Sequence, residues 1–276
     1  MHSTAFPIPS GKMLPDGTFA GKTALITGGG TGLGLAIARE LRALGANVVI
    51  ASRSEEHLRP AAQELDPTGK HVLSRACDVR KPDDVKAVVA ATMERFGAID
   101  LLVNNAAGNF VCPIAAMSPN AFGTVIDIVL KGTFNVTRFA GEHMIAKGKG
   151  AILCIGATYA WHAGPGVAHS AAAKAGVHSL TQSLAVEWGP LGIRTNTLVP
   201  GPIDTEGASS KLFPSEAAHR RIEARTPTKR LGGELEVARA SAFLLSDYAS
   251  YFNGAMVTMD GGLWLDNGAF EELTKG

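Results

Sequence analysis

Aromatic residues, charges and cysteines are all scarce in this sequence of 276 residues. Aromatics make up 6% of it and charged residues 18%, and the formal net charge is +1. No general attraction to nucleic acid or to an anionic membrane is therefore expected. The three cysteines, Cys77, Cys112 and Cys154, are widely spaced and include no CxxC pair. They favour a reducing compartment over a disulfide framework, and we expect no metal site.

Membrane and targeting signals are also missing. No apolar run is long enough to cross a bilayer. The first residues lack a basic segment followed by an apolar one, and the last three are not a Ser-Lys-Leu peroxisomal address. We therefore expect a cytoplasmic protein that does not associate with membranes.

Short apolar segments that alternate with helical ones are what the sequence has in quantity. Strands are expected at residues 23–27, 47–52, 71–76, 101–104, 151–155, 193–198 and 255–259. Helices are expected at 82–96, 119–146, 170–188 and 234–245, and in a run that ends at Leu44. Continuously apolar strands have both faces covered. The pattern predicts an α/β fold: a Rossmann-like doubly wound parallel sheet of about seven strands, with helices on both faces.

A single domain is expected to hold nearly all of the chain. Residues 1–20, rich in proline and glycine, are predicted to form an irregular N-terminal arm. Residues 21–276 contain no repeat or linker that would divide them, so they are predicted to form one Rossmann-type domain. Within it, residues at about 200–230 are rich in proline, serine and charge and are expected to form a lid over the site.

A glycine-rich turn joins the first expected strand to the first helix. Glycines at this place let the backbone approach a pyrophosphate, whose charge the helix N-terminus stabilises. A flexible loop has a similar composition, but the position between strand and helix favours a dinucleotide. The residues expected to contact it in this turn are Gly28, Thr31, Gly32, Leu33 and Gly34.

The end of the second expected strand indicates which dinucleotide binds. A site for NAD has an acidic residue here, whereas this chain has Ser52 and Arg53, a hydroxyl and a guanidinium that suit a 2′-phosphate. The sequence therefore predicts NADP(H); the alternative for Arg53 is a solvated surface arginine. Further cofactor contacts are expected after the third and fourth strands, from Asp78, Val79, Asn105, Ala106 and Ala107.

The stretch from Tyr159 to Lys174 has an unusual spacing. Ser170 precedes Lys174 by one helical turn and lies on the same face. A serine is not acidic enough to share a proton with a polarised carbonyl, and the tyrosine nearest to the lysine is Tyr159, fifteen residues before it. The histidines around this stretch lack the spacing and the carboxylate companions of a metal site.

These features together resemble the short-chain dehydrogenase/reductase family over nearly the whole chain. The matching segments are Thr27 to Gly34, Asn104 to Gly108, Lys174, Asn196, Pro200 to Ile203, and Asp260 to Gly262. The resemblance implies that Pro200, Gly201 and Ile203 also contact the cofactor. That family usually carries a catalytic Asn-Ser-Tyr-Lys set, of which this chain keeps only the lysine. The other three positions are occupied by Val129, Ala157 and Ser170.

One subgroup of that family departs from the usual set in the same way. The chain is similar to the 2,4-dienoyl-CoA reductases, especially the mitochondrial type, in Met13 to Pro15, Thr27 to Gly34, Ile50 to Arg53, Asn104 to Phe110, and Gly201 to Ala208. The resemblance implies a catalytic tyrosine upstream of the lysine, at Tyr159. It also implies a substrate-holding asparagine on the long helix, where this chain has Lys131. Lys131 either donates to the thioester oxygen or points elsewhere.

The resemblance implies NADPH-dependent reduction of a 2,4-dienoyl-CoA to a 3-enoyl-CoA, in the β-oxidation of unsaturated fatty acids. Tyr159 is then expected to donate a hydrogen bond to the thioester oxygen, and Lys174 to bond the nicotinamide ribose. Ser170 is expected to position Tyr159 or the ligand. Asn109 and Phe110 are expected to line the acyl pocket.

The resemblance implies a homotetramer, with the helices expected at 119–146 and 170–188 as its interface. A basic cluster suits either the phosphates of CoA or a solvated face, and comprises Arg220, Arg221, Arg225, Lys229 and Arg230. Two alternatives stay open: an NADP(H)-dependent reductase of 3-oxoacyl or other carbonyl compounds, and a catalytically silent NADP(H)-binding protein.

Overall fold

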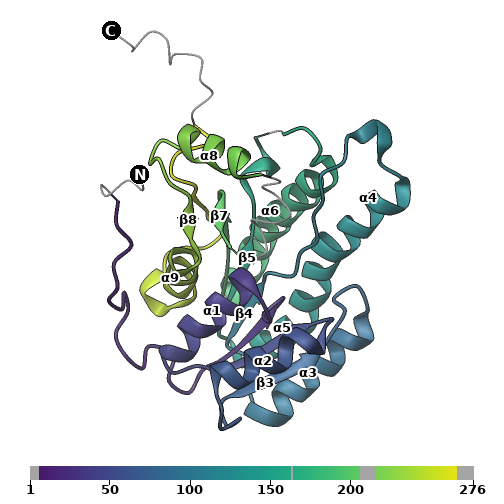
Figure 1. Ribbon diagram of the computed structural model, residues 1–276. Helices are drawn as coiled ribbons and strands as arrows, with labels where there is room; N and C mark the ends of the chain where they lie inside the picture. The colour runs from purple at the N-terminus through teal and green to yellow at the C-terminus, as the bar shows by residue number, and fades with distance from the viewer. Residues whose placement is uncertain (1–5, 163, 206–214, 266–276) are drawn as a thin grey trace.

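The computed structural model describes residues 6–162, 164–205 and 215–265 of the chain. Its centre is a seven-stranded parallel sheet in the order β3-β2-β1-β4-β5-β6-β9 (Figure 1). The strands are β1 (Thr23–Thr27), β2 (Asn47–Ser52), β3 (Val72–Ala76), β4 (Leu101–Asn104), β5 (Gly150–Ile155), β6 (Ile193–Pro200) and β9 (Met256–Met259). The direction of winding changes between β1 and β4, which is where ligands bind in such sheets.

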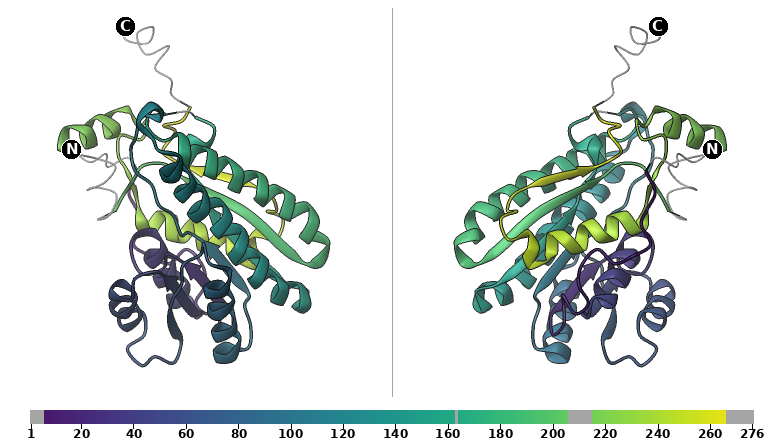
Figure 2. Two further views of the ribbon diagram at one scale, coloured as in Figure 1. Left: turned by 90° about the vertical axis from the view of Figure 1, so that its right-hand side faces the viewer. Right: turned by 90° about the vertical axis from the view of Figure 1, so that its left-hand side faces the viewer.

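Helices cover both faces of the sheet (Figure 2). They are α1 (Gly32–Ala43), α2 (Glu55–Leu65), α3 (Pro82–Phe96), α4 (Pro119–Ile126), α5 (Gly132–Lys147), α6 (Ala168–Trp188), α8 (Glu216–Arg225) and α9 (Glu234–Leu245). Two apolar clusters fill the space on either side, one under α1, α2 and α9 and the other under α3, α5 and α6. Leu25 and Ile26 belong to different clusters, because successive strand side chains point to opposite faces. The predicted doubly wound architecture is confirmed.

The long helix expected at 119–146 is interrupted. Between α4 and α5 lies a π-helical segment, Asp127–Lys131. The backbone N–H of Gly132 bonds the carbonyl of Asp127, five residues back instead of the four of an α-helix. The prediction of one continuous α-helix is wrong here. The residues on both sides are helical, so the sequence pattern does not reveal the one extra residue that the π-helical segment inserts.

Two further parts of the fold are not predicted by the sequence pattern. α2 has a buried face at Leu58 and Ala61, but Pro60 breaks its helical signal. In the segment expected to be a lid, α8 forms, and two short strands, β7 (Ile203–Asp204) and β8 (Gly232–Gly233), pair in parallel. Residues 206–214 of that expected lid lie outside the described residues. None of the helices in the described part is both long and apolar enough to span a membrane.

The N-terminal arm is held against the end of the domain that carries α9. Arg230 Nε donates to the carbonyl of Phe6 at 3.0 Å. Arg239, on α9, donates to the carbonyls of Pro9 and Gly11. These bonds fix an arm that has no regular secondary structure of its own; residues 1–5 of the predicted arm lie outside the described residues.

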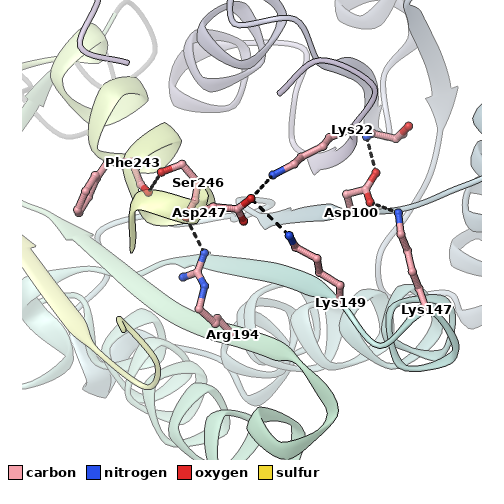
Figure 3. Close-up of polar contacts among 9 residues, drawn as sticks. Lys22, Asp100, Lys147, Lys149, Arg194, Phe243, Ser246 and Asp247 are labelled. Atoms are coloured by element: carbon pink, nitrogen blue, oxygen red, sulfur yellow. Dashed lines mark hydrogen bonds and ion pairs between the residues drawn. The ribbon is translucent and has the colours of Figure 1, made fainter. Parts of the chain in front are cut away.

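Charged side chains pair with one another at the edge where the strands begin (Figure 3). Lys22 and Lys149, which directly precede β1 and β5, reach the same carboxylate oxygen of Asp247, at 3.1 and 3.4 Å. Arg194, on β6, donates to the backbone carbonyls of three residues, Leu244, Ser246 and Phe252. We call this set the amino-edge network; it comprises Lys22, Asp100, Lys147, Lys149, Arg194 and Asp247.

Candidate active site

The turn between β1 and α1 depends on glycine at its tightest points. Gly28 and Gly32 have φ angles of 65° and 50°, a left-handed conformation that disfavours other residues. A Cβ on Gly34 would lie 2.1 Å from the carbonyl oxygen of Gly28. Thr31, the N-cap of α1, makes no side-chain capping bond. The first N–H groups of α1 are therefore available to a ligand that approaches the glycine backbone.

Asn105 and Thr27 tie this turn to the end of β4. Asn105 Nδ2 donates to the carbonyls of Thr27 and Gly28, at 3.0 and 3.2 Å. Thr27 Oγ1 accepts hydrogen bonds from the backbone N–H groups of Asn105 and Ala106, both at 3.0 Å. The structure thus places Asn105, expected at the cofactor, as a brace of the turn. Thr27 also braces the turn. The sequence analysis did not predict this role, although a hydroxyl at the end of a strand could have indicated it.

A cavity of about 490 Å³ opens beside the turn, within the range of small-molecule sites. It brings together a first group of residues, all predicted to hold the dinucleotide: Gly28, Thr31, Ser52, Arg53, Asp78, Val79, Ala106 and Ala107. A second group was missed: Gly30, Ala51, Ser54, His57, Cys77 and Ile128. Of the other predicted contacts, Leu33 packs against the apolar cluster under α1. A cavity between a glycine turn and an arginine fits the adenosine and phosphates of a dinucleotide.

The charge in this cavity is arranged around Asp78. Arg80 Nε donates to both carboxylate oxygens of Asp78, at 2.9 and 3.0 Å, and these bonds lower the pKa of Asp78. Asp78 is therefore ionised but already paired. Arg53 lies at the end of β2 with its side chain exposed, and it makes no hydrogen bond to another described residue. Its charge also lowers the pKa of Asp78, but its guanidinium donors remain available to an anion.

Tyr159 and Ser170 form the second part of the site. Tyr159 lies on a 3₁₀ turn, Thr158–Ala160, directly after β5. The Ser170 hydroxyl, on the first turn of α6, donates to the Tyr159 hydroxyl oxygen at 3.0 Å. Burial raises the pKa of Tyr159, although the bond from Ser170 acts in the opposite direction. The phenol is therefore protonated at neutral pH and can donate a hydrogen bond.

Lys174 lies one turn further along α6 and is buried, with 6% of its surface exposed. Its ammonium donates to the carbonyl of Ile155, at the end of β5. Burial lowers the pKa of Lys174 to about 8. His178, one more turn along, has a pKa lowered to about 4 by burial and by the charge of Lys174. The cation of the site is therefore the lysine, with a neutral histidine behind it.

The loop after β4 meets the start of α6. Asn109 Oδ1 accepts a hydrogen bond from the backbone N–H of Phe110 at 2.9 Å, so it is occupied within its own loop. The Phe110 ring lies 4.3 Å from the ring of His169, the residue before Ser170. The structure thus brings Phe110 to the neighbourhood of Tyr159 and Ser170, as an acyl-pocket residue would require.

Lys131 lies in the π-helical segment and is mostly exposed. Its ammonium pairs with Asp127 Oδ1 at 2.6 Å, one turn back. Val129, in the same segment, is buried in the apolar cluster under α5 and α6. The structure therefore shows a partner for Lys131 other than a substrate, and a contact with the thioester oxygen stays a prediction.

The segment after β6, which carries the predicted cofactor contacts Pro200, Gly201 and Ile203, packs against the end of β9; these three residues are not among those that line the cavity. Gly201 donates its backbone N–H to the carbonyl of Met259 at 3.0 Å, and a Cβ on Gly201 would lie 2.4 Å from the Cβ of Asp260. Pro200 ends β6 and Ile203 begins β7. Within the described residues, no group of three or more His, Cys, Asp and Glu side chains could hold a metal ion.

Comparison with known sequences identifies similar proteins over nearly the whole chain. A family model described as enoyl-(acyl carrier protein) reductase matches residues 28–264. A probable, (2E)-enoyl-CoA-producing 2,4-dienoyl-CoA reductase of Bacillus subtilis is 48% identical over 247 residues, 89% of this chain and 97% of the relative. A peroxisomal, (3E)-enoyl-CoA-producing 2,4-dienoyl-CoA reductase of Pongo abelii is 44% identical over 246 residues, 88% of this chain and 84% of the relative.

Solved structures agree with these sequences. A short chain dehydrogenase from Bacillus anthracis has a TM-score of 0.82 at 44% identity and covers 90% of this chain and 98% of its own. A gluconate 5-dehydrogenase from Burkholderia cenocepacia, solved in complex with NADP and tartrate, has a TM-score of 0.85 at 35% identity and covers 91% and 98%. Together with the glycine turn, the braced strand ends and the buried lysine, these matches show that the chain belongs to the short-chain dehydrogenase/reductase family.

Proposed function

We propose that this chain reduces 2,4-dienoyl-CoA thioesters with NADPH. The observation that carries the proposal is the contact between Tyr159 and Ser170, whose hydroxyl oxygens lie 3.0 Å apart. Ser170 lies one helical turn before Lys174 on α6. In most of the family the tyrosine itself would occupy the position of Ser170. Relatives at 41–48% identity that are named as 2,4-dienoyl-CoA reductases support the same reaction.

The reaction needs a hydrogen-bond donor at the thioester oxygen. Bound NADPH supplies a hydride to the far end of the conjugated diene. Negative charge then develops on the thioester oxygen, where one preorganised donor is worth ~3–4 kcal/mol. We assign that donor to Tyr159. Because Ser170 donates to the phenol oxygen, the phenol proton is left free for the substrate.

Lys174 is assigned to the nicotinamide ribose and to the electrostatics of the site. Its ammonium is already aligned by the carbonyl of Ile155. A buried positive charge acts more strongly on a nearby developing anion than an exposed one, because little water screens it. Phe110 and Asn109 are proposed to contact the acyl part of the substrate, and Ser170 to hold Tyr159 in place.

The preference for NADP(H) is proposed from Ser52 and Arg53. A guanidinium and a hydroxyl at the end of β2 suit a 2′-phosphate, and Arg53 has no hydrogen-bonding partner among the described residues. The adjacent acid, Asp78, is paired with Arg80 and so repels a phosphate less. The gluconate 5-dehydrogenase solved with NADP offers an example within the family.

An assay of NADPH oxidation with 2,4-hexadienoyl-CoA tests the proposed function directly. Turnover should be accompanied by loss of the near-ultraviolet absorbance of the conjugated diene. Acetoacetyl-CoA is the matched control, because a carbonyl reductase would consume it without that optical change. Preference for acetoacetyl-CoA would favour the carbonyl reductase alternative, for which a levodione reductase structure at 36% identity is a precedent. NADPH binding without turnover of either substrate would favour a silent protein.

The proposed product is a 3-enoyl-CoA, formed when C2 takes up a proton, with water as its proposed source. The names of the relatives include both (2E)- and (3E)-enoyl-CoA producers, so the position of the remaining double bond distinguishes two forms of the reaction. NMR of the product from 2,4-hexadienoyl-CoA decides between them.

Three wider expectations belong to the same proposal. Arg220, Arg221 and Arg225, on or at the end of α8, are proposed to receive the phosphates of CoA, with α8 as part of a lid. The chain is proposed to form a homotetramer through the helices predicted at 119–146 and 170–188, which are α4, α5 and α6. A cytoplasmic location is proposed too, although several relatives are named as peroxisomal enzymes.

A further inference from the structure

We propose that His57 acts with Arg53 as a second recognition residue for the 2′-phosphate of NADP(H), a role that rests on the proposed cofactor preference. His57 lies on the first turn of α2 and lines the dinucleotide cavity together with Ser52, Arg53 and Ser54. It is a specificity-determining residue in this assignment and takes no part in the chemistry.

The position of His57 between two parts of the cofactor site supports this assignment. A Cβ on Gly30 would lie 3.3 Å from the Cβ of His57 and 3.4 Å from its carbonyl carbon. The first turn of α2 therefore packs directly over the glycine turn. Four residues earlier, Arg53 marks the end of β2. His57 thus bridges the turn that meets the pyrophosphate and the residue that meets the 2′-phosphate.

The imidazole of His57 is also free to bind. Its side chain is exposed, and neither ring nitrogen has a hydrogen-bond partner in the described part of the chain. By contrast, the exposed His71 at the start of β3 bonds Asn47 Oδ1 through Nδ1, at 2.9 Å. The packing of His57 against Gly30 is made by its Cβ and backbone atoms, so the imidazole ring is not needed for that contact. An exposed, unbonded imidazole on a residue that lines the same cavity as an arginine is suited to donate to a phosphate oxygen.

The acids around His57 do not prevent anion binding. Glu55 pairs with Arg59 at 2.9 Å, and Asp78 pairs with Arg80. Glu56 is the neighbouring acid that keeps an exposed carboxylate. With two of these acids paired, Arg53 supplies the positive charge that lines this end of the cavity, and His57 adds a hydrogen-bond donor beside it.

Calorimetric binding of NADP⁺, NAD⁺ and 2′,5′-ADP to the full-length protein tests the inference without turnover. His57→Ala should weaken NADP⁺ and 2′,5′-ADP about tenfold, the size of one hydrogen bond to a charged group, and leave NAD⁺ within about twofold. His57→Gln, which keeps a donor, should recover most of the loss. His71→Gln is the matched control and should bind all three ligands like the parent protein.

The outcomes separate this inference from the proposal on which it rests. Equal losses for NADP⁺ and NAD⁺ in His57→Ala, or no loss at all, would overturn the assignment of His57. Arg53→Gln is measured alongside. If it lowers the ratio of NADP⁺ to NAD⁺ affinity while His57→Ala does not, only the role of His57 fails. If Arg53→Gln leaves that ratio unchanged, the proposed NADP(H) preference itself fails. Unchanged melting temperatures check that the variants fold.

Discussion

The two edges of the central sheet handle polar groups in opposite ways. At the edge where the strands begin, the charges of the amino-edge network satisfy one another or bind backbone carbonyls (Figure 3). At the edge where the strands end, Arg53 and His57 have no hydrogen-bond partner among the described residues, and the proton of Tyr159 is free. Both edges are polar, but among the described residues the charges at the first edge are paired, whereas at the second edge Arg53, His57 and Tyr159 offer donors to a ligand.

The difference follows from where each charge has its counter-charge. Lys22 and Lys149 enter β1 and β5 beside Asp247, so the starts of two strands are tied to the segment that follows α9. Exposed pairs of this kind are worth only about 0–1 kcal/mol each. At the other edge, Asp78 is hydrogen-bonded to Arg80, and Arg53 contributes only its charge to that acid, so its guanidinium makes no hydrogen bond to another described residue. Pairing of charges, more than their number, therefore distinguishes the edge where the strands begin, which is structural, from the edge where they end, which we call the binding edge.

The largest effect is expected at Tyr159. Tyr159→Phe removes one hydroxyl from the binding edge and should lower kcat for a dienoyl-CoA about 10²–10³-fold, as loss of an oxyanion donor does. NADPH binding should be unchanged. Tyr251→Phe is the matched control, because Tyr251 is fully exposed at the opposite edge. Retention of near-full turnover by Tyr159→Phe would mean that the Tyr159 hydroxyl is not the donor to the thioester oxygen.

The next largest effect is expected at Arg53. Arg53→Gln should lower kcat/KM for NADPH about 10–100-fold, because a hydrogen bond to a charged group is worth about 1.5–3 kcal/mol. The value for NADH should change little. Arg59→Gln on α2 serves as control, since Arg59 already pairs with Glu55. Equal losses for both cofactors would show that Arg53 acts on the fold and not on the 2′-phosphate.

The pH dependence of activity should report Lys174. Burial lowers its pKa from 10.5 to about 8, so the protonated form is lost as pH rises through about 8. We expect kcat/KM for NADPH to be level below that pH and to fall above it, approaching tenfold per pH unit. In Lys174→Arg the fall should move to higher pH, because a guanidinium stays protonated. A fall near pH 8 that persists in Lys174→Arg would assign the titration to another group.

The same shift has a consequence for stability. Between pH 8 and 10.5 the unfolded state binds more protons at Lys174 than the folded state does. The contribution of Lys174 to the free energy of unfolding should therefore rise with pH across that window. Denaturant titrations of the parent protein and of Lys174→Met, compared at both ends of the window, measure this contribution.

A smaller effect is expected when the amino-edge network is cut. Asp247→Ala leaves Lys22 and Lys149 without their shared carboxylate. A loss of about 1 kcal/mol corresponds to a melting temperature lower by about 2–4 °C in a domain of this size. Activity at 25 °C should be unaffected. A fall in kcat/KM at unchanged melting temperature would mean that the two edges are not as distinct as their pairing suggests.

The smallest effect is expected at Lys131. Because its ammonium pairs with Asp127 and its side chain is exposed, Lys131→Met should change the free energy of unfolding by about 0.5 kcal/mol or less and kcat by about twofold or less. Steady-state kinetics with the dienoyl-CoA measure this. A loss comparable with that of Tyr159→Phe would instead place Lys131 at the thioester oxygen, and would add an ion-paired residue to the binding edge.

Much of the fold could be predicted from the sequence, because the signals were local. The strand at Leu101–Asn104 and the helices at Pro82–Phe96 and Glu234–Leu245 have the predicted bounds. Each has an apolar pattern that a few neighbouring residues define, and the two helices also begin with proline or acidic residues. α2 was not visible, since Pro60 obscures it. The positions of Ser54 and His57 beside the cavity were hidden with it, because they depend on where α2 begins.

The site divides in the same way. The glycine turn and the pair Ser52 and Arg53 form one short stretch each, so the sequence predicts that they line one cavity. The contact between Tyr159 and Ser170 joins a 3₁₀ turn to a helix across an irregular loop. Only the family resemblance suggested it. Asp78 and Arg80 are only two residues apart, but their ion pair could not be predicted, because the backbone conformation decides where the two side chains point.

The π-helical segment at Asp127–Lys131 has a consequence for any alignment of this helix. It accommodates one residue more than an α-helix of the same rise, so the side chains after Gly132 are turned by about 100° from the positions that α-helical counting assigns them. A helical wheel drawn across the whole of 119–147 therefore shifts frame halfway. Deletion of a single residue from the segment would restore the regular count and rotate α5, and with it the face presented to α6.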